Sequence, residues 1–306
     1  MILAFAAAAL AAAQPAAAPA ATDEVVIEGR RITRSEAARI AADHVRGVSI
    51  PNDFGQLARW NTGICPKVVG IAPVYAEIVI KRVAAAVRVA GASLAGDGCK
   101  PNLVLAFALD SKALAQAVAR EAGSQLFQST PPAQKRVLLE SDLPVRWIYA
   151  LGAGSGGGAP LSDGAAPPIS AVGAGPDRLQ GLGGPGSITT QRTSGSLIDT
   201  NLVVSITGAF VIVDLKRAEG FPLLSVASYA ARVALAETKL PPRPGEADSI
   251  LALFDRAENK AAAQDLSAWD RALLVALYRT PPEREARYQK SRVQAEMVRA
   301  LTGGAR

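Results

Sequence analysis

Two segments of the chain have the hydrophobic pattern of core helices. From Pro73 to Gly91, apolar side chains recur every three or four residues, and charged side chains occupy the positions between them. Residues 223–237 are apolar on nearly every side, and Pro222 stands where a first helical residue belongs. A helix with so little polar surface needs to be buried. We therefore expect two core helices, of which the second is the more buried.

Short runs of apolar, β-branched and aromatic residues are typical of buried strands. Such runs occur at residues 102–109, 145–151, 187–192 and 202–215. Gly208 interrupts the last run, which indicates a bulge or a hairpin turn at that point. We expect an α+β fold in which a mixed sheet built from these strands packs against the two core helices, 73–91 and 223–237.

Further helices are expected on both sides of this core. Near the N-terminus, a short strand at 25–29 precedes a helix that Thr33 or Ser35 can cap. The remaining helices are expected at residues 111–122, 133–139, 249–254, 267–278 and 283–301. Ser267 and Asp270 have the spacing of a near capping box. The chain should thus end in a C-terminal helical segment.

Two stretches of low complexity are expected to lie outside the folded core. Residues 1–21 contain the apolar run from Ile2 to Ala13 and then Ala-Pro repeats, which is typical of a secretory signal peptide. No basic residue precedes Arg30, so an Ala/Pro-rich tail is the alternative. Residues 152–186 are dense in Gly, Ala, Pro and Ser and predict a flexible insertion. Residues 22–306 then form a single α+β domain.

The two cysteines, Cys65 and Cys99, agree with export of the chain. An even number of cysteines in an exported protein indicates a disulfide bond first. This bond would bracket the helix at 73–91 and contribute about 4 kcal/mol to stability. Two buried free thiols are the alternative. We expect a periplasmic or secreted protein.

The formal net charge of +6 comes mostly from dispersed arginines rather than from one basic tract. Nucleic-acid binding requires a clustered patch or a recognisable module, so no nucleic-acid partner is expected. The last helix carries several basic residues, namely Arg284, Arg287, Lys290, Arg292 and Arg299. A weak contact with an anionic membrane surface is therefore one hypothesis. The expected partner is an unknown protein or envelope component, and the oligomeric state is left open.

The chain has few of the bases and metal ligands that known hydrolases use, because His44 is its one histidine. A Ser-His-Asp triad would have to use His44, which we expect to be solvated or paired locally with Asp43 or Arg46. A zinc site needs several His, Cys or carboxylate ligands, so we expect no metal and no cofactor. The glycine-rich residues 152–157 lack the helix that a nucleotide phosphate requires immediately after them.

A resemblance to a known family rests on three segments, at residues 220–236, 247–254 and 266–278. They contain Ser-Ile-Leu-Ala-Leu-Phe ending at Phe254, and Leu-Ser-Ala-Trp-Asp followed by Leu-Tyr ending at Tyr278. These segments resemble the C-terminal third of an uncharacterised family of secreted, zincin-like proteobacterial proteins. Members of that family carry a His-Glu-containing helix, a Ser-Ile/Leu-Phe motif and a Leu-Thr-x-x-Asp…Leu-Tyr ending.

The resemblance implies a zincin-like arrangement that has lost its metal site. Where the family has His-Glu, this chain has Ala227 and Ser228, and Arg232 falls near the next polar position. The helix would then be a packing element and the protein a pseudoenzyme. No functional residue of the family can be transferred to this chain, because none of the relevant positions matches.

Export, a disulfide bond and an incomplete catalytic set favour a non-catalytic protein that binds a partner or stabilises an assembly. We assign no catalytic residue, and an enzyme is the less favoured hypothesis. The alternative is a degenerate or atypical hydrolase with a pocket near the 223–237 helix, formed by Ser225, Ser228 and Arg232. That alternative predicts that the three side chains line a concave site.

Overall fold

The computed structural model describes residues 24–27, 29–49, 55–122, 127, 130–155, 202–255, 257–261 and 264–303. The signal peptide or tail predicted at 1–21 and the strand predicted at 187–192 lie outside the described residues, as does most of the predicted insertion at 152–186. The described residues have an α+β fold with a mixed sheet, which confirms the predicted fold class.

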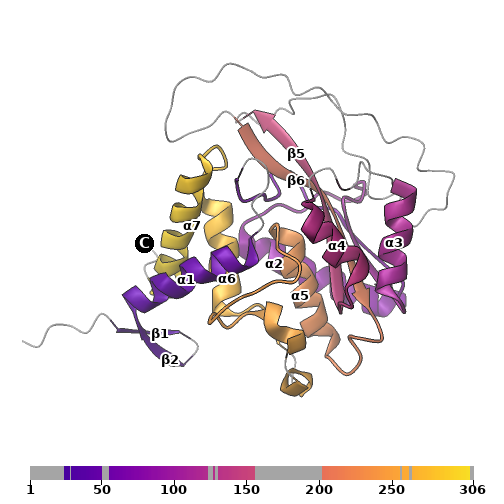
Figure 1. Ribbon diagram of the computed structural model, residues 1–306, viewed down its shortest axis with the longest axis horizontal. Coiled ribbons are helices and arrows are strands. Elements are labelled where there is room, and N and C mark those ends of the chain that lie inside the picture. The colour runs from indigo at the N-terminus through magenta and orange to yellow at the C-terminus, as the bar shows by residue number, and fades with distance from the viewer. Residues whose placement is uncertain are drawn as a thin grey trace, which may run out of the picture.

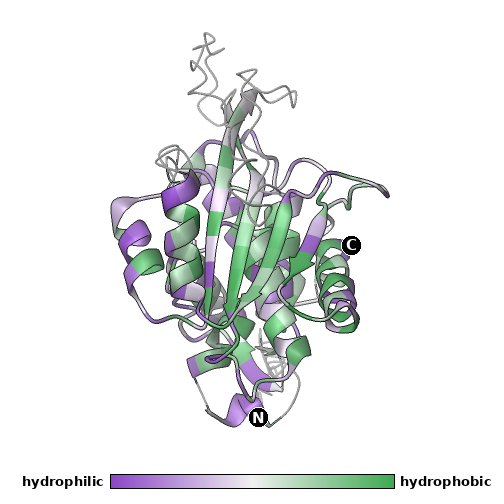
Figure 2. Cartoon of the chain, turned by 90° about the vertical axis from the view of Figure 1, so that its right-hand side faces the viewer, coloured by the Kyte–Doolittle hydropathy of each residue, from purple (hydrophilic) through white to green (hydrophobic). Residues whose placement is uncertain are grey.

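A four-stranded sheet in the order β3-β4-β6-β5 forms the middle of the fold (Figure 1). The strands are β3 (Pro66–Val69), β4 (Leu103–Ala108), β5 (Val145–Ser155) and β6 (Leu202–Asp214). β3, β4 and β6 run parallel, whereas β5 pairs with β6 in the antiparallel direction. The strands are mainly hydrophobic (Figure 2), as expected of a sheet covered by helices on both faces.

The edge strand β5 is longer than the sequence predicts. It continues from Gly152 to Ser155, so these residues belong to a strand and not to the start of a flexible insertion. The register of the β5–β6 pairing shifts between Ala150 and Leu151, opposite Gly208. Gly208 therefore lies at a bulge in one continuous strand, as one of the two predictions expected. The alternative prediction, a hairpin turn at this glycine, is wrong.

The helix α5 (Leu223–Leu235) covers one face of the sheet and is buried along almost its entire length, as predicted. It packs on α2 (Pro73–Ala90), the other predicted core helix. Tyr149 of β5 points to this face, since its hydroxyl donates a hydrogen bond of 2.5 Å to the carbonyl oxygen of Val233. α2 and α5 thus form a helical layer on the Tyr149 side of the sheet.

The helices α3 (Ser111–Ala122) and α4 (Pro132–Glu140) cover the opposite face. Residues an odd number of positions apart on a strand point to opposite faces of the sheet. Arg146 lies three positions before Tyr149, so its side chain points to the face opposite that of Tyr149. The buried guanidinium of Arg146 donates hydrogen bonds to the carbonyl oxygens of Leu138 and Ser141, at 2.6 and 2.8 Å. The fold therefore has three layers, with the sheet between two layers of helices.

A second helical group gathers at one end of the molecule, away from α3 (Figure 1). It consists of α1 (Arg34–Val48), α6 (Ala268–Arg279) and α7 (Ala286–Leu301), with α7 packed on both α1 and α6. The hairpin of β1 (Glu24–Ile27) and β2 (Arg30–Thr33) precedes α1. Among the described residues, no helix has both the length and the apolar character needed to cross a bilayer.

Two predicted helix starts are confirmed. The hydroxyl of Thr33 accepts a hydrogen bond from the backbone N–H of Glu36, and Ser267 and Asp270 form a complete capping box at the start of α6. The segment predicted as an α-helix at 249–254 is instead the 3-10 helix η4 (Ile250–Asp255), followed by η5 (Ala257–Lys260).

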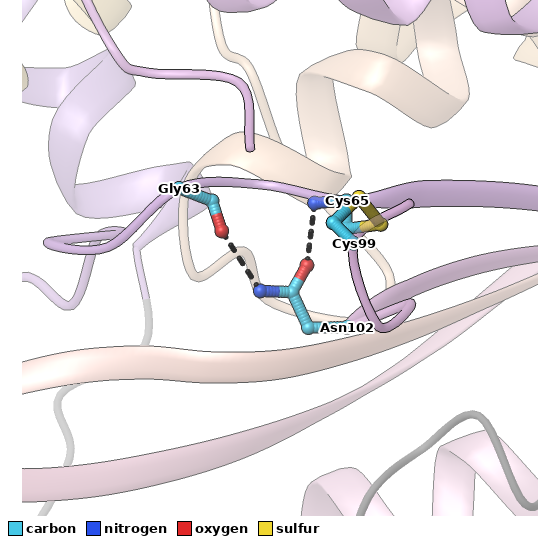
Figure 3. Close-up of a disulfide and its surroundings, with 4 residues drawn as sticks. All are labelled: Gly63, Cys65, Cys99 and Asn102. Carbon is cyan, nitrogen blue, oxygen red and sulfur yellow. Dashed lines mark hydrogen bonds between the residues drawn. A yellow bond between two sulfur atoms is a disulfide. The ribbon is translucent and has the colours of Figure 1, made fainter. Parts of the chain in front are cut away.

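The predicted disulfide bond joins Cys65 to Cys99, with 6.1 Å between the two Cα atoms (Figure 3). Asn102 ties the same region together, because its side chain accepts a hydrogen bond from the backbone of Cys65 and donates one to the carbonyl oxygen of Gly63. Cys65 directly precedes β3, and Cys99 follows α2. The bond therefore brackets α2 between two strands, as expected from the sequence.

Candidate functional site

A concave site with a volume of about 340 Å³ lies at the carboxyl edge of the sheet, and we call it the carboxyl-edge groove. Its walls come from the start of β5, the turn after β6, the helix α5, the segment 240–242 and the end of η4. Val145 pairs with Val213, so the start of antiparallel β5 lies beside the end of parallel β6. Ligands of sheets with parallel strands bind preferentially outside the carboxyl ends of those strands.

Three aromatic rings form one wall of the groove. The ring centroids of Phe221 and Phe254 lie 4.9 Å apart in an edge-to-face arrangement, and those of Tyr229 and Phe254 lie 5.2 Å apart. Such contacts hold rings in defined orientations. The ammonium of Lys260 lies 5.1 Å from the centroid of Phe221, where the negative face of the ring attracts a cation. This wall is therefore a fixed aromatic surface.

Tyr229 is the most unusual of these residues, because its hydroxyl has no hydrogen-bond partner among the described residues. The side chain lines the groove, although only 4% of Tyr229 is exposed. The hydroxyl oxygen is not one of the fully buried polar atoms without a partner, so it is open to the solvent of the groove. Burial raises the pKa of Tyr229, and the nearby carboxylate of Asp255 raises it further. The hydroxyl thus stays protonated and is free to bond to a ligand.

Arg217 and Asp255 are the charged residues that line the groove. One guanidinium nitrogen of Arg217 lies 3.1 Å from a carboxylate oxygen of Asp142, and 45% of the Arg217 side chain is exposed. Asp214 fixes the turn, since its carboxylate accepts hydrogen bonds from the backbone N–H groups of Arg217 and Ser111. Those two bonds lower the pKa of Asp214 against the opposing effect of burial.

A second concave site, of about 280 Å³, lies between the β1–β2 hairpin and the helices α6 and α7. Its charged lining residue is Arg271, whose guanidinium donates a hydrogen bond to the carbonyl oxygen of Leu266. The other lining residues are apolar. This site therefore has fewer polar lining residues than the carboxyl-edge groove.

On α5, three residues beyond Tyr229, lies a fully buried polar cluster formed by Arg232, Asp270 and His44, which we call the sealed cluster. The Nε atom of Arg232 lies 3.5 Å from a carboxylate oxygen of Asp270. Asp270 also accepts hydrogen bonds from the hydroxyl of Ser249 and the backbone N–H of Ile250, both at 2.7 Å. The sealed cluster therefore joins α1, α5, η4 and α6.

The prediction that His44 is solvated or paired with its sequence neighbours is wrong. His44 is fully buried, and its Nδ1 atom lies 3.0 Å from the carbonyl oxygen of Pro244. Because a carbonyl can only accept, Nδ1 carries the proton. Burial lowers the pKa of His44, and the Arg232 cation lowers it further, whereas Asp270 and the Pro244 carbonyl oppose the shift. Asp43 instead pairs with Arg46 at 3.0 Å.

The residues of the predicted pocket, Ser225, Ser228 and Arg232, are each 0% exposed. The hydroxyl of Ser225 accepts a hydrogen bond of 2.6 Å from the backbone of Gln264, and that of Ser228 donates one of 3.1 Å to Asp265. Since these side chains are packed in the core, they do not line a concave site, and the hydrolase alternative loses its expected geometry.

The residues that line the carboxyl-edge groove were not identified from the sequence. Tyr229 lies within the predicted helix between Ser228 and Arg232, but its position on the groove side depends on η4 and on the start of β5. The available signal for the groove was the pair of aromatic residues Phe221 and Phe254, of which one lies just before the helix and the other lies in η4.

Metal-binding groups do not come together in the part of the chain that the structure describes. No set of three or more His, Cys, Asp and Glu side chains there could hold a metal ion. Ala227 and Ser228, which the resemblance would align with the family's His-Glu, are buried within α5. Arg82 and the hydroxyl of Ser228 both contact Asp265, and these contacts help to lower the pKa of that carboxyl against the effect of burial.

Three basic residues of α7 have acidic partners, and two of them share one carboxylate. Arg292 and Arg299 both pair with Glu296, at 2.9 and 2.8 Å, and Arg287 pairs with Glu285 at 2.9 Å. An attractive surface for anionic lipid requires unpaired positive charge. This pairing weakens the argument for a membrane contact through α7.

Comparison with known proteins gives no relative: no family model, no curated protein and no solved structure matches the chain.

Proposed function

We propose that this chain is an exported, non-catalytic protein that acts by binding a partner of the cell envelope. The carboxyl-edge groove carries the proposal, because it combines an aromatic wall with a tyrosine hydroxyl that opens to the groove and forms no hydrogen bond with a described residue. Concave, mostly apolar sites with a few polar groups are typical of ligand binding. The resemblance to a zincin-like family without its metal ligands supports a binding role rather than hydrolysis.

The disulfide bond supports export to an oxidising compartment such as the periplasm. Disulfides persist there and are reduced in most cytosols. Cell fractionation combined with thiol alkylation would test this part of the proposal. We expect the mature chain in the periplasmic or secreted fraction, with Cys65 and Cys99 protected from alkylation until a reductant is added. A cytosolic chain with two reactive thiols would contradict export.

Photo-cross-linking in the native cell would test binding at the groove. A photoreactive phenylalanine analogue at Phe254 lies on the aromatic wall, and the same analogue at Tyr288 serves as an exposed aromatic control on α7. We expect one envelope component to be captured from position 254 and not from position 288. Equal capture from both positions, or none from either, would contradict a partner in the groove.

Absence of turnover needs its own test. We expect the purified mature chain to contain no stoichiometric zinc and to show no activity in broad peptidase and esterase assays. A turnover that disappears on Ser228→Ala would overturn the non-catalytic part of the proposal, because that hydroxyl is assigned here to a structural bond with Asp265.

A further inference from the structure

The chemistry of the carboxyl-edge groove narrows the class of ligand, and this step rests on the proposed binding function. The Tyr229 hydroxyl and the Asp255 carboxylate both line the groove, and neither forms a hydrogen bond or ion pair with the described residues. The two residues lie on the same wall, because the Tyr229 ring packs against Phe254, which directly precedes Asp255 in the chain. A carboxylate next to a hydroxyl oxygen offers acceptors for a group with several N–H donors, such as an ammonium.

Arg217 supplies the complementary charge from a different wall of the groove. Asp142 pairs with the Nη2 atom of Arg217. The Nε and Nη1 groups therefore keep N–H donors that form no hydrogen bond with a described residue. A guanidinium binds carboxylates with good geometry through such paired donors. The backbone of Arg217 is held by Asp214, which fixes where this residue leaves the chain.

The surface between these charges is apolar and small. The rings of Phe221 and Phe254 and the prolines Pro144 and Pro241 line it, within a volume of about 340 Å³. This volume is near the lower end of the range of roughly 300–1,000 Å³ for small-molecule sites, so it suits a ligand of about two residues better than a long segment.

The geometry points to a short apolar peptide with free ends as the ligand of the carboxyl-edge groove. Its ammonium binds Asp255 and the Tyr229 hydroxyl, its carboxylate binds Arg217, and its apolar side chains contact the aromatic wall. A singly charged apolar ligand would engage only one of the two charged walls. A dipeptide zwitterion engages both.

Calorimetric titration with three forms of one dipeptide tests this assignment. The probes are leucyl-phenylalanine with free ends, its N-acetyl form without the ammonium, and its C-terminal amide without the carboxylate. We expect the free dipeptide to bind at least about tenfold more tightly than either blocked form, because each block removes a charged hydrogen-bonding group. Octanoate serves as the single-charge apolar control and is expected to bind more weakly than the free dipeptide.

Variants of the groove assign each end of the ligand to its wall. Asp255→Asn should weaken the free and amidated forms about tenfold and leave the N-acetyl form unchanged. Arg217→Gln should weaken the free and N-acetyl forms and leave the amide unchanged. Circular dichroism and thermal unfolding of each variant confirm that the fold is intact before the titrations are compared.

Several results would overturn the assignment. Blocked and free dipeptides that bind equally, variants that weaken all forms equally, or octanoate that binds more tightly than the dipeptide would each contradict a zwitterion site. If no dipeptide binds while cross-linking from Phe254 still captures an envelope component, this inference fails and the proposed function stands. If cross-linking fails as well, the proposed function fails with it.

Discussion

The helix α5 carries two polar sites that lie three residues apart and differ in their surroundings. Arg232 is fully buried with Asp270 and His44 facing it from other helices. Tyr229 is also buried, but its hydroxyl lines a groove and has no partner among the described residues. Removal of the countercharge of a buried ion pair is strongly destabilising, so Asp270 is needed where Arg232 is buried. A hydroxyl that opens to a groove and bonds no described residue is available to a ligand.

This comparison corrects the assignment that the residue types suggest. Ser225, Ser228 and Arg232 were the candidate pocket residues in the sequence, yet here they are packed in the core, and Arg232 helps to join α5 to α6. Tyrosine and phenylalanine look like core residues, yet here they form the wall of the groove. Substitutions in the two sites should therefore affect stability to different degrees, and the largest loss is expected in the sealed cluster.

Asp270→Asn should have the largest effect, because it leaves the buried guanidinium of Arg232 without its countercharge. Breaking one partner of a buried ion pair costs about 3–5 kcal/mol of unfolding free energy. Urea denaturation would measure this loss. Asp248→Asn is the matched control, since Asp248 is exposed and should change stability by less than about 0.5 kcal/mol. Equal effects of the two substitutions would show that the sealed cluster is not structural.

Gly47→Ala should weaken the sealed cluster from the side of α1. A Cβ at Gly47 would overlap the carbonyl oxygen of Arg243, which lies next to the Pro244 carbonyl that His44 binds. We expect a loss of about 1–3 kcal/mol, as is typical of overpacking. Gly96→Ala provides the control, because a Cβ at Gly96 meets no atom within 4 Å. Thermal unfolding of both variants measures the difference, and a stable Gly47→Ala protein would contradict the close contact.

Stability should also fall in mild acid because of His44. The ordinary pKa of histidine is about 6.5, and that of folded His44 is lower. As the pH falls below about 6.5, the unfolded state therefore binds a proton that the folded state resists, and the unfolding free energy decreases by up to about 1.4 kcal/mol per pH unit. The loss continues until the pH reaches the folded pKa. Above about pH 7 this contribution is fully present.

The control for this pH dependence is His44→Asn, which keeps a donor near the Pro244 carbonyl but does not titrate. Urea denaturation of both proteins at pH 8, 6.5 and 5 would give the difference in slope. The charged groups that face His44 are Arg232 of α5 and Asp270 of α6. Parallel slopes for the two proteins would contradict a neutral, buried His44.

Groove substitutions should have the smallest effect on stability. Asp255→Asn removes no contact within the described residues, and Arg217→Gln removes an exposed ion pair with Asp142. Exposed ion pairs contribute about 0–1 kcal/mol. Both variants should therefore unfold within about 1 kcal/mol of the wild type in urea. A loss as large as that of Asp270→Asn would mean that the groove residues also hold the fold together.

The sequence was sufficient for the features that depend on local pattern. The apolar helix α5, the capping box at Ser267 and the strand β4 each follow from residues close together in the chain. The disulfide bond followed from the number of cysteines and the expected compartment. The strand β3 was missed, because it has only four residues and its partner β4 lies more than thirty positions further along the chain.

The candidate site could not be derived in the same way. Tyr229, Arg217 and Asp255 meet only after the sheet has ordered β5 beside β6 and η4 has packed on α5. His44 and Asp270 lie 226 positions apart, as their numbers show, so no local pattern indicates that both face Arg232. Access to the groove, rather than residue type, distinguishes Tyr229 from the sealed cluster, and this access exists only in the fold. In the sealed cluster, Nε and Nη2 of Arg232 and Nε2 of His44 are fully buried and have no hydrogen-bond partner among the described residues.

Tyr229→Phe tests the central claim most directly, because it removes the unpartnered hydroxyl and keeps the ring against Phe254. Titration of this variant with the free dipeptide is the measurement. The account predicts a loss of affinity of about tenfold with an unfolding free energy unchanged within about 0.5 kcal/mol. Unchanged affinity, or a large loss of stability, would show that the hydroxyl belongs to the fold and that the groove does not bind its ligand through Tyr229.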